Sequence, residues 1–146
     1  LERLRGKDCK IALATSKPEV FAVRILEHFK IEESFDVIVG STMDEKRTDK
    51  AEVIEEALRQ LGIATENDKK AVLMVGDREH DVIGAAKCGI DCLGVYYGYA
   101  REGELEMAGA AYVAENLENL GRFMDAHAGA CGIHQNHDEE KQACQN

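Results

Sequence analysis

Two short polar segments, each directly after an apolar run, contain side chains with which a protein could bind a phosphate group and a divalent cation. Thr15, Ser16 and Lys17 offer a hydroxyl and, at the start of an expected helix, backbone N–H groups that suit a phosphate oxygen. Asp77 and Asp81 offer carboxylate oxygens four residues apart, the ligand type that Mg²⁺ prefers.

Lys50 adds an ammonium group at a position that helix stability does not explain. It opens an expected helix, and a cation is unfavourable at the positive N-terminal end of a helix dipole. A hydroxyl, an ammonium and two carboxylates are parts of a magnesium-assisted phosphoryl-transfer site. The attacking group is the part that these segments lack.

The elements that must position these residues follow from the hydrophobic pattern. Short apolar runs alternate with segments of helical period, which is typical of βαβ units around a parallel sheet. Ligands bind beyond the carboxyl ends of the strands in such a sheet, where the polar segments are expected to lie. The expected strands cover residues 11–14, 36–40, 71–75, 92–95 and 111–113.

Two capping boxes predict where helices begin. Ser16 with Glu19, and Asp49 with Glu52, have the spacing in which a cap side chain and a glutamate satisfy backbone N–H groups reciprocally. Further helices are expected between 77 and 89, near 102–107 and at about 116–124. The apolar face of the first helix is expected to consist of Phe21, Ile25, Leu26 and Phe29.

Length and composition predict one α/β domain. The 146 residues, 45% of them apolar, suffice for one compact domain but not for two full ones. We expect this domain at residues 1–124 and a disordered tail at residues 125–146, where the apolar periodicity is lost. The spacing of the tail's potential zinc ligands matches no common structural pattern. These ligands are Cys131, His134, His137 and Cys144.

The charge balance argues against polyanionic partners. The sequence has 18 Lys and Arg against 28 Asp and Glu, a formal charge of −10, which disfavours nucleic acid and anionic membrane surfaces. No apolar run approaches the roughly 20 residues of a spanning helix. Five cysteines without a CxxC pair argue against a disulfide framework and favour a cytoplasmic protein.

Three motifs, in this order, resemble the second, third and fourth motifs of the haloacid-dehalogenase superfamily of hydrolases. The similarity is greatest to its phosphoglycolate-phosphatase-like branch and covers about residues 1–122. The motifs are Leu13-Ala14-Thr15-Ser16-Lys17, Lys50-Ala51-Glu52-Val53-Ile54 and Val75-Gly76-Asp77-Arg78-Glu79-His80-Asp81.

The resemblance implies a fold, a cofactor and a role for each residue. The fold would be a Rossmann-like three-layer α/β core with a parallel sheet. Thr15 would bind the phosphoryl group with help from the Ser16 backbone N–H, and Lys50 would stabilise an aspartyl-phosphate intermediate. Asp77 and Asp81 would hold Mg²⁺ in a phosphomonoesterase that acts on a small phosphorylated metabolite.

The sequence departs from the family pattern at the first motif. Family members carry a DxDGT-like segment after their central first strand, and its two aspartates are the nucleophile and the general acid. Residues 1–146 contain no such segment. We therefore expect the C-terminal part of a longer phosphatase, with its central strand and cap domain absent and without turnover by itself. The absent cap leaves the individual substrate open.

Other interpretations of the same residues remain. A non-catalytic phosphate- and metal-binding module that has lost its nucleophile is the main alternative, and a phosphoacceptor module of the receiver type is a weaker one. Singly, Thr15 and Ser16 could be a strand end and an N-cap, and Asp77 and Asp81 a turn residue and a first-turn acid. Solvated charges or packing residues are the commoner interpretation of Lys17, Arg78, Tyr96, Tyr97 and Tyr99.

Overall fold

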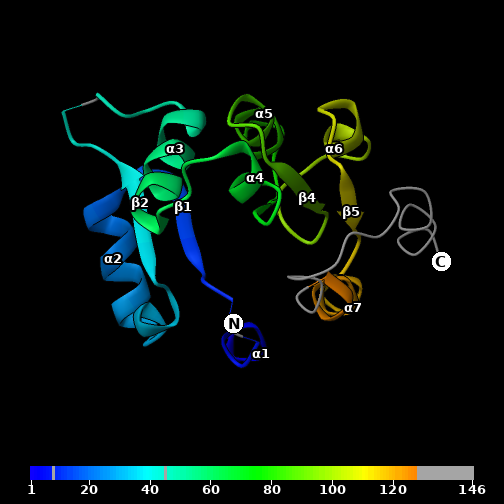
Figure 1. The fold of residues 1–146 in the computed structure, drawn as a ribbon, viewed down its shortest axis with the longest axis horizontal. Helices are drawn as coiled ribbons and strands as arrows, with labels where there is room; N and C mark the ends of the chain where they lie inside the picture. Colours follow the sequence, from blue (N-terminus) through cyan, green and yellow to red (C-terminus); the bar gives the residue numbers. More distant parts are fainter. Residues whose placement is uncertain (8, 45, 128–146) are drawn as a thin grey trace. The chain divides into compact units, whose positions relative to one another are not determined.

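The computed structural model describes residues 1–7, 9–44 and 46–127, and these form an α/β fold with parallel strands in two compact units. The first unit comprises residues 1–69, and the second begins at residue 70. The elements of the first unit are α1 (Glu2–Arg5), β1 (Ala12–Pro18), α2 (Glu19–His28), the 3₁₀ helix η1 (Glu32–Ser34), β2 (Val37–Ser41), α3 (Lys50–Leu61) and α4 (Glu66–Lys69) (Figure 1). Those of the second are β3 (Leu73–Gly76), α5 (Glu79–Lys87), β4 (Asp91–Val95), α6 (Glu104–Met107), β5 (Tyr112–Ala114) and α7 (Leu117–His127).

The first unit is built on a two-stranded parallel sheet. Strands β1 and β2 pair in register from Ala12 opposite Val37 to Ala14 opposite Val39, and α2 and α3 both pack on them. The fully buried Val39 of β2 and Val53 of α3 form the centre of the core. The carboxyl end of β1, which carries Thr15, is thereby fixed against α3.

The second unit is built on a three-stranded parallel sheet in the order β3-β4-β5. Gly76 at the end of β3 pairs with Gly94 of β4, so the segments that follow these two strands leave the sheet side by side. Helix α5 packs on β3 and β4. The buried core cluster consists of Leu93, Val95, Ala114 and Phe123.

The first predicted capping box is wrong. Strand β1 continues through Ser16 to Pro18, and α2 begins only at Glu19 with Pro18 at the N-cap and no side-chain cap. A residue that precedes proline is pushed out of the helical region, which keeps Lys17 extended. Ser16 is therefore an exposed strand residue and not a helix cap.

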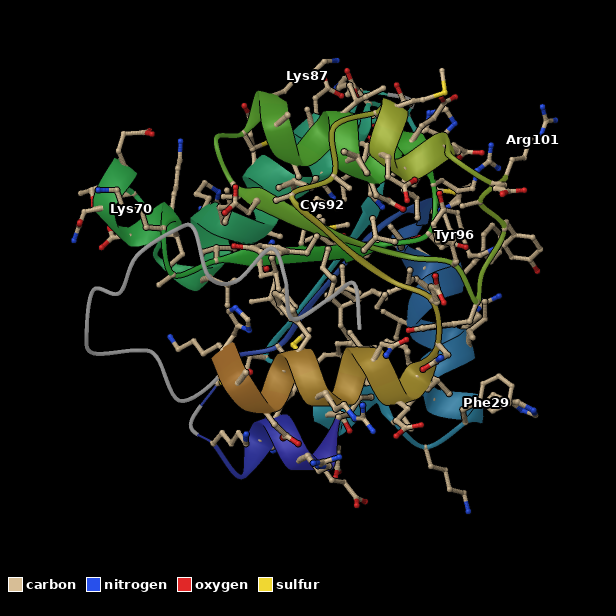
Figure 2. All side chains as sticks on the ribbon, turned by 90° about the vertical axis from the view of Figure 1, so that its right-hand side faces the viewer. Phe29, Lys70, Lys87, Cys92, Tyr96 and Arg101 are labelled. Atoms are coloured by element: carbon tan, nitrogen blue, oxygen red, sulfur yellow. The ribbon has the colours of Figure 1, made fainter. Side chains whose placement is uncertain are left out.

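The predicted apolar face of α2 is largely wrong as well. Leu26 is buried together with Ala22, one turn before it. Phe21, Ile25 and Phe29 are instead 45%, 42% and 65% exposed, and the ring of Phe29 points away from the helix (Figure 2). Periodicity identified an apolar stripe, but the buried side of α2 consists of Ala22 and Leu26.

The second capping box is confirmed. Asp49 Oδ1 accepts a hydrogen bond from Ala51 N at 3.1 Å, and Glu52 Oε2 accepts one from Asp49 N at 3.2 Å. The helix ends at Gly62, whose φ of 77° is the left-handed conformation that glycine adopts without strain. Both ends of α3 are therefore where the sequence predicts them.

Helix α7 extends to His127, so residues 125–127, expected in the tail, form its last turn. The other tail residues, including Cys131, His134, His137 and Cys144, lie outside the described residues. None of the described helices is long and apolar enough to cross a membrane.

Candidate functional site

In the first unit, the side chain of Lys50 reaches the strand end that carries Thr15. Lys50 is the first residue of α3, and its Nζ donates a hydrogen bond to the carbonyl oxygen of Ala14 at 2.7 Å. Thr15 is the next residue of β1. The structure thus brings the Lys50 ammonium to the carbonyl oxygen of the residue just before Thr15.

Thr15 and Ser16 lie at the end of β1 with different exposure. Thr15 is half-buried, and its Oγ1 accepts a hydrogen bond from Lys17 N at 3.2 Å. Because a hydroxyl accepts and donates at once, Thr15 retains its O–H as a donor. Ser16 and Lys17 are exposed. Among these three residues, Thr15 is therefore the one whose hydroxyl is half-buried and retains a donor.

The turn after β1 is held against β2 by a close backbone approach. A Cβ atom on Gly40 would lie 2.5 Å from the Cα and N of Glu19 and from the carbonyl oxygen of Lys17. Gly40 is buried, and its N donates to Glu19 Oε2 at 3.1 Å. Residue 40 must therefore lack a side chain if the segment after Thr15 is to keep its position.

Arg47 completes this support from the segment before α3. Its Nη2 forms an ion pair with Glu19 Oε2 at 3.0 Å, and its Nε donates to the carbonyl oxygen of Gly40 at 2.9 Å. The Arg47 backbone N also donates to Thr42 Oγ1 at 3.0 Å. Arg47 thus links the first residue of α2 to the end of β2, close in sequence to Lys50.

In the second unit, Asp77 and Asp81 stand together at the end of β3. Asp81 is only 8% exposed, and its Oδ2 accepts hydrogen bonds from Asp77 N at 3.1 Å and from Arg78 N at 3.2 Å. These bonds turn the carboxylate of the first turn of α5 back toward the strand end. The structure thus brings the Asp81 carboxylate to the backbone of Asp77, at the end of β3.

Two glycines fit closely around these carboxylates. A Cβ on Gly76 would lie 2.2 Å from the Asp81 Cβ, and a Cβ on Gly98 would lie 2.2 Å from the Asp77 Oδ2. Tyr99 N, next to Gly98, donates to the same Asp77 oxygen at 3.0 Å. The loop that follows β4 therefore closes onto Asp77.

Glu104 fastens this loop to the start of α5. Its Oε1 accepts from Arg78 Nε at 2.8 Å and from Glu79 N at 3.0 Å, while its Oε2 accepts from Arg101 N at 3.1 Å. These donors, led by the Arg78 side chain, lower the pKa of the Glu104 carboxyl from 4.5 to about 2. In Figure 2, Tyr96 and Arg101 are labelled on the loop from β4 to α6, with Arg101 nearer to α6.

The tyrosines of the loop differ in surroundings. Tyr96 donates its hydroxyl proton to Glu106 and accepts from Gly103 N at 2.8 Å, so it holds the two ends of the loop. Partial burial, and to a smaller extent the charge of Asp77, raise the pKa of the Tyr97 hydroxyl. Tyr99 is 84% exposed. Packing, the commoner interpretation from the sequence, describes Tyr96 but not Tyr99.

The donor set of Asp77 and Asp81 fits Mg²⁺. In the described part of the chain no group of three or more His, Cys, Asp or Glu side chains is placed to hold a metal ion. Mg²⁺ does not need such a cage, because it keeps several waters and is commonly bound by one or two carboxylates together with substrate phosphate oxygens. Two carboxylates whose orientation is set by backbone N–H groups meet that requirement.

Sequence reasoning missed Glu19, Arg47 and Glu104. Glu19 was expected only as the partner of Ser16 in a capping box, Arg47 and Glu104 belonged to no motif, and each is one of many charged residues in a chain with 32% Asp, Glu, Lys and Arg. The glycines at 40, 76 and 98 were the available signal, because glycine after or near a strand end can mark a close backbone approach. Arg78, interpreted as a solvated charge, forms an ion pair with Glu104.

The model of the haloacid dehalogenase-like hydrolase family matches residues 1–95, which include all five predicted site residues. The chain belongs to this family. The motif-based prediction of the family is thereby confirmed, as is the α/β fold.

Several relatives in this family share extended similarity with the chain. A 5′-nucleotidase of Pseudomonas aeruginosa is 39% identical over 87% of the chain and 56% of its own length. The tyrosine-protein kinase PtkA of Mycobacterium tuberculosis is 48% identical over 69% of the chain and 33% of its own length. A phosphoglycolate phosphatase of Pseudomonas putida is 31% identical over 82% of the chain and 43% of its own length.

The crystal structure of a predicted phosphatase from Clostridium acetobutylicum shares the fold. It has a TM-score of 0.78 and 40% identity, and the alignment covers 86% of this chain and 58% of that one. The chain thus spans between about a third and just over half of the length of the haloacid dehalogenase-like relatives named.

Proposed function

We propose that this chain supplies the phosphate-binding and metal-binding residues of a Mg²⁺-dependent phosphomonoesterase that acts on a small phosphorylated metabolite. The observation that carries the proposal is the hydrogen bond of 2.7 Å from Lys50 Nζ to the Ala14 carbonyl oxygen. It holds a cation at the backbone of the residue before Thr15, toward the carboxyl end of a parallel strand.

The proposed role of Lys50 and Thr15 is to bind the oxygens of the phosphoryl group. An ammonium and a hydroxyl from neighbouring positions can donate to two oxygens of one phosphate, and their interaction strengthens as negative charge develops. The exposed Ser16 backbone N–H is proposed as a third donor. Lys50 has an additional role as the group that offsets the charge of a phosphorylated intermediate.

The proposed role of Asp77 and Asp81 is to hold the cation. A bound Mg²⁺ would polarise a phosphoryl oxygen and offset its charge. The chain's own contribution is to orient both carboxylates, Asp81 through the N–H groups of residues 77 and 78 and Asp77 through Tyr99 N.

The covalent route is part of the proposal. An aspartate carboxylate attacks phosphorus and forms an aspartyl-phosphate as the bond from phosphorus to the leaving oxygen breaks. Water then releases phosphate and regenerates the carboxylate. Because residues 1–146 contain no DxDGT segment, we expect the chain by itself to lack turnover. Purified chain should release no p-nitrophenolate from p-nitrophenyl phosphate in millimolar Mg²⁺, and a Mg²⁺-dependent rate would contradict this.

Phosphate affinity tests the proposal without requiring turnover. Inorganic phosphate is titrated calorimetrically into the chain in the presence of Mg²⁺. Lys50→Ala should weaken binding by at least about tenfold, because a hydrogen bond to a charged group contributes roughly 1.5–3 kcal/mol. Lys10→Ala, which removes an exposed ammonium just before β1, is the matched control and should change little. Equal affinity of the native and Lys50→Ala chains would contradict the proposal.

Protein phosphorylation is a second candidate, favoured by the 48% identity with the tyrosine-protein kinase PtkA. Phosphate-binding residues and a Mg²⁺ site serve phosphoryl transfer to water or to a tyrosine. Transfer of radiolabelled phosphate from ATP to a tyrosine-containing acceptor, in a longer protein that contains this chain, would favour the kinase. Release of inorganic phosphate from small phosphate esters would favour the phosphatase.

We also propose the cytoplasm as the compartment. The sequence has five cysteines, an odd number without a CxxC pair, which argues against a disulfide framework. Chains without a disulfide framework are typical of a reducing compartment. Small phosphorylated metabolites are the proposed partners, whereas nucleic acid and membrane surfaces are disfavoured by the charge of −10.

A further inference from the structure

We propose that Glu104, a residue of α6 outside all three motifs, positions the Asp77 carboxylate for the divalent cation. The inference rests on the proposed function, which assigns Asp77 and Asp81 as the ligands of that cation. Glu104 is a positioning residue in this proposal, because it touches neither carboxylate and acts through the segments on either side of them.

A closed ring of contacts connects Glu104 to Asp77 from two sides. On one side, Arg78 is the next residue after Asp77, and its Nε donates to Glu104 Oε1 at 2.8 Å. On the other side, Arg101 N donates to Glu104 Oε2 at 3.1 Å, and Tyr99, two residues earlier, donates its N–H to Asp77 Oδ2 at 3.0 Å. The carboxylate of Glu104 is therefore the point at which the ring closes.

The burial of Glu104 indicates that this contact is a fixed one. Its side chain is only 11% exposed, whereas that of its partner Arg78 is 41% exposed. A surface ion pair between mobile side chains contributes little. Here, however, two backbone N–H groups, from Glu79 and Arg101, bond to the same carboxylate as the Arg78 side chain. Three donors from separate positions fix both oxygens of Glu104.

The ring controls which Asp77 oxygen faces the loop. Gly98 leaves no room between the loop and Asp77, because a Cβ there would lie 2.2 Å from Oδ2. If the loop is released from Glu104, Tyr99 N is no longer held against Oδ2, and the Asp77 carboxylate is free to rotate. A carboxylate that is no longer held in one orientation binds a cation more weakly. Mutation of residues that orient metal ligands commonly lowers metal affinity for this reason.

If Glu104 only stabilised the fold, its loss would change the free energy of unfolding and not the metal affinity. Glu104 also accepts from Glu79 N, the first N–H group of α5, and so acts as a cap supplied by another helix. Loss of a cap lowers the free energy of unfolding but leaves the metal affinity of the folded chain unchanged. Metal affinity measured on folded protein therefore separates positioning from capping.

The experiment measures Mn²⁺ binding by electron paramagnetic resonance, with Mn²⁺ as the probe for the Mg²⁺ site. Glu104→Gln, which keeps the side-chain length, should raise the Mn²⁺ dissociation constant about tenfold, the lower end of the range for residues that orient ligands. Glu102→Gln removes the same charge from an exposed position two residues away and should change the constant by less than about twofold. Circular dichroism selects conditions under which all three chains are folded.

A second measurement needs no metal. Amide hydrogen exchange at Tyr99 should accelerate in Glu104→Gln and stay unchanged in Glu102→Gln, since the N–H loses its acceptor only when the ring opens. Equal Mn²⁺ affinity in the native and Glu104→Gln chains, or unchanged exchange at Tyr99, would overturn the inference. Absence of Mn²⁺ binding by the native chain would overturn the proposed function, and this inference with it. Failure of the inference alone would instead show as Mn²⁺ binding that Glu104→Gln leaves unchanged, so the two outcomes are distinguishable.

Discussion

At the scale of single residues, the two proposed metal ligands are held in different ways. Asp81 is buried and bonds to two consecutive backbone N–H groups at the end of β3. Asp77 bonds to the N–H of Tyr99, 22 residues further along the chain, in the loop after β4. The position of Asp81 is thus set locally, whereas that of Asp77 depends on the loop after β4.

Replacing Asp81 should therefore cost stability as well as metal binding. Asp81→Ala leaves the N–H groups of Asp77 and Arg78 without this acceptor in a partly buried position, and a lost acceptor of this kind costs about 1–3 kcal/mol. The free energy of unfolding in urea measures the effect. Asp91→Ala, at an exposed carboxylate in the same unit, is the control and should stay within about 0.5 kcal/mol. A loss no larger than that of the control would count against the structural role of Asp81.

Glu104 should make stability sensitive to acid. Its pKa is lowered from 4.5 to about 2, so its contribution is fully present above pH 4.5 and is lost as the pH falls toward 2. The difference in unfolding free energy between the native and Glu104→Gln chains should be constant from pH 7 to 5 and shrink below pH 4. Urea unfolding at several pH values measures this, and a difference that grows on acidification would refute it.

The sequence indicated a functional role for a single residue where its charge was unfavourable for the local secondary structure. Lys50 stood at a helix start, where a cation is unfavourable, and the structure shows its ammonium bonded to the end of β1. Glu104 had no such conflict, since an acidic residue in a first helical turn is ordinary. Its contact with Arg78, 26 residues away, depends on how β4 and α6 pack, which no local pattern encodes.

At the scale of elements, the turn from β1 into α2 depends on one glycine of β2. The first residue of α2, Glu19, approaches the backbone of Gly40 so closely that a Cβ would lie 2.5 Å from Glu19 Cα. The same turn lies at the end of β1, a few residues after Thr15 and Ser16. The orientation of the proposed phosphate-binding segment is therefore coupled to the end of β2.

Gly40→Ala should accordingly destabilise the first unit. The atoms that its methyl group would meet are backbone atoms of α2 and β1, which cannot rotate away, so the strands or helix must shift at a cost of roughly 1–3 kcal/mol. Gly6→Ala is the matched control, because its nearest atoms lie at 3.7 Å and its φ of −66° suits alanine. Thermal unfolding compares the two variants, and equal melting temperatures would show that Gly40 has room for a side chain.

Element boundaries were predictable where local chemistry decided them. The Asp49 capping box and the Gly62 stop fixed α3, since both work through backbone bonds within a few residues. At Ser16 the same pattern misled, because Pro18 keeps the preceding residue extended and prolongs β1. The face of α2 was misjudged because packing on the sheet buried Ala22 and Leu26, whereas Phe21, Ile25 and Phe29 stayed exposed.

At the scale of the whole molecule, each sheet has an unpaired edge. Strand β1 pairs with β2 only, and β3 pairs with β4 only, among the strands that the structure describes. The sequence predicted the parallel α/β fold, whereas the division into units at residues 69 and 70 had no signal in composition. An open strand edge is a template for pairing with another chain.

The 146-residue chain should therefore associate as its concentration rises. Sedimentation velocity from micromolar to submillimolar concentration should show a growing fraction of dimers or larger species, despite a net charge of −10 that opposes association. High salt screens this repulsion and should increase the fraction. A single monomeric species across the whole range would contradict the prediction.

The most direct test of the central claim is to locate phosphate and Mg²⁺ on the chain by nuclear magnetic resonance. In ¹⁵N-labelled chain, added Mg²⁺ should shift the amide signals of Asp77 and Arg78, and inorganic phosphate should then shift those of Thr15 and Ser16. Phosphate shifts confined to other segments, such as those that contain the basic residues Lys46 and Arg59, would contradict the account. So would the absence of Mg²⁺ shifts at the end of β3.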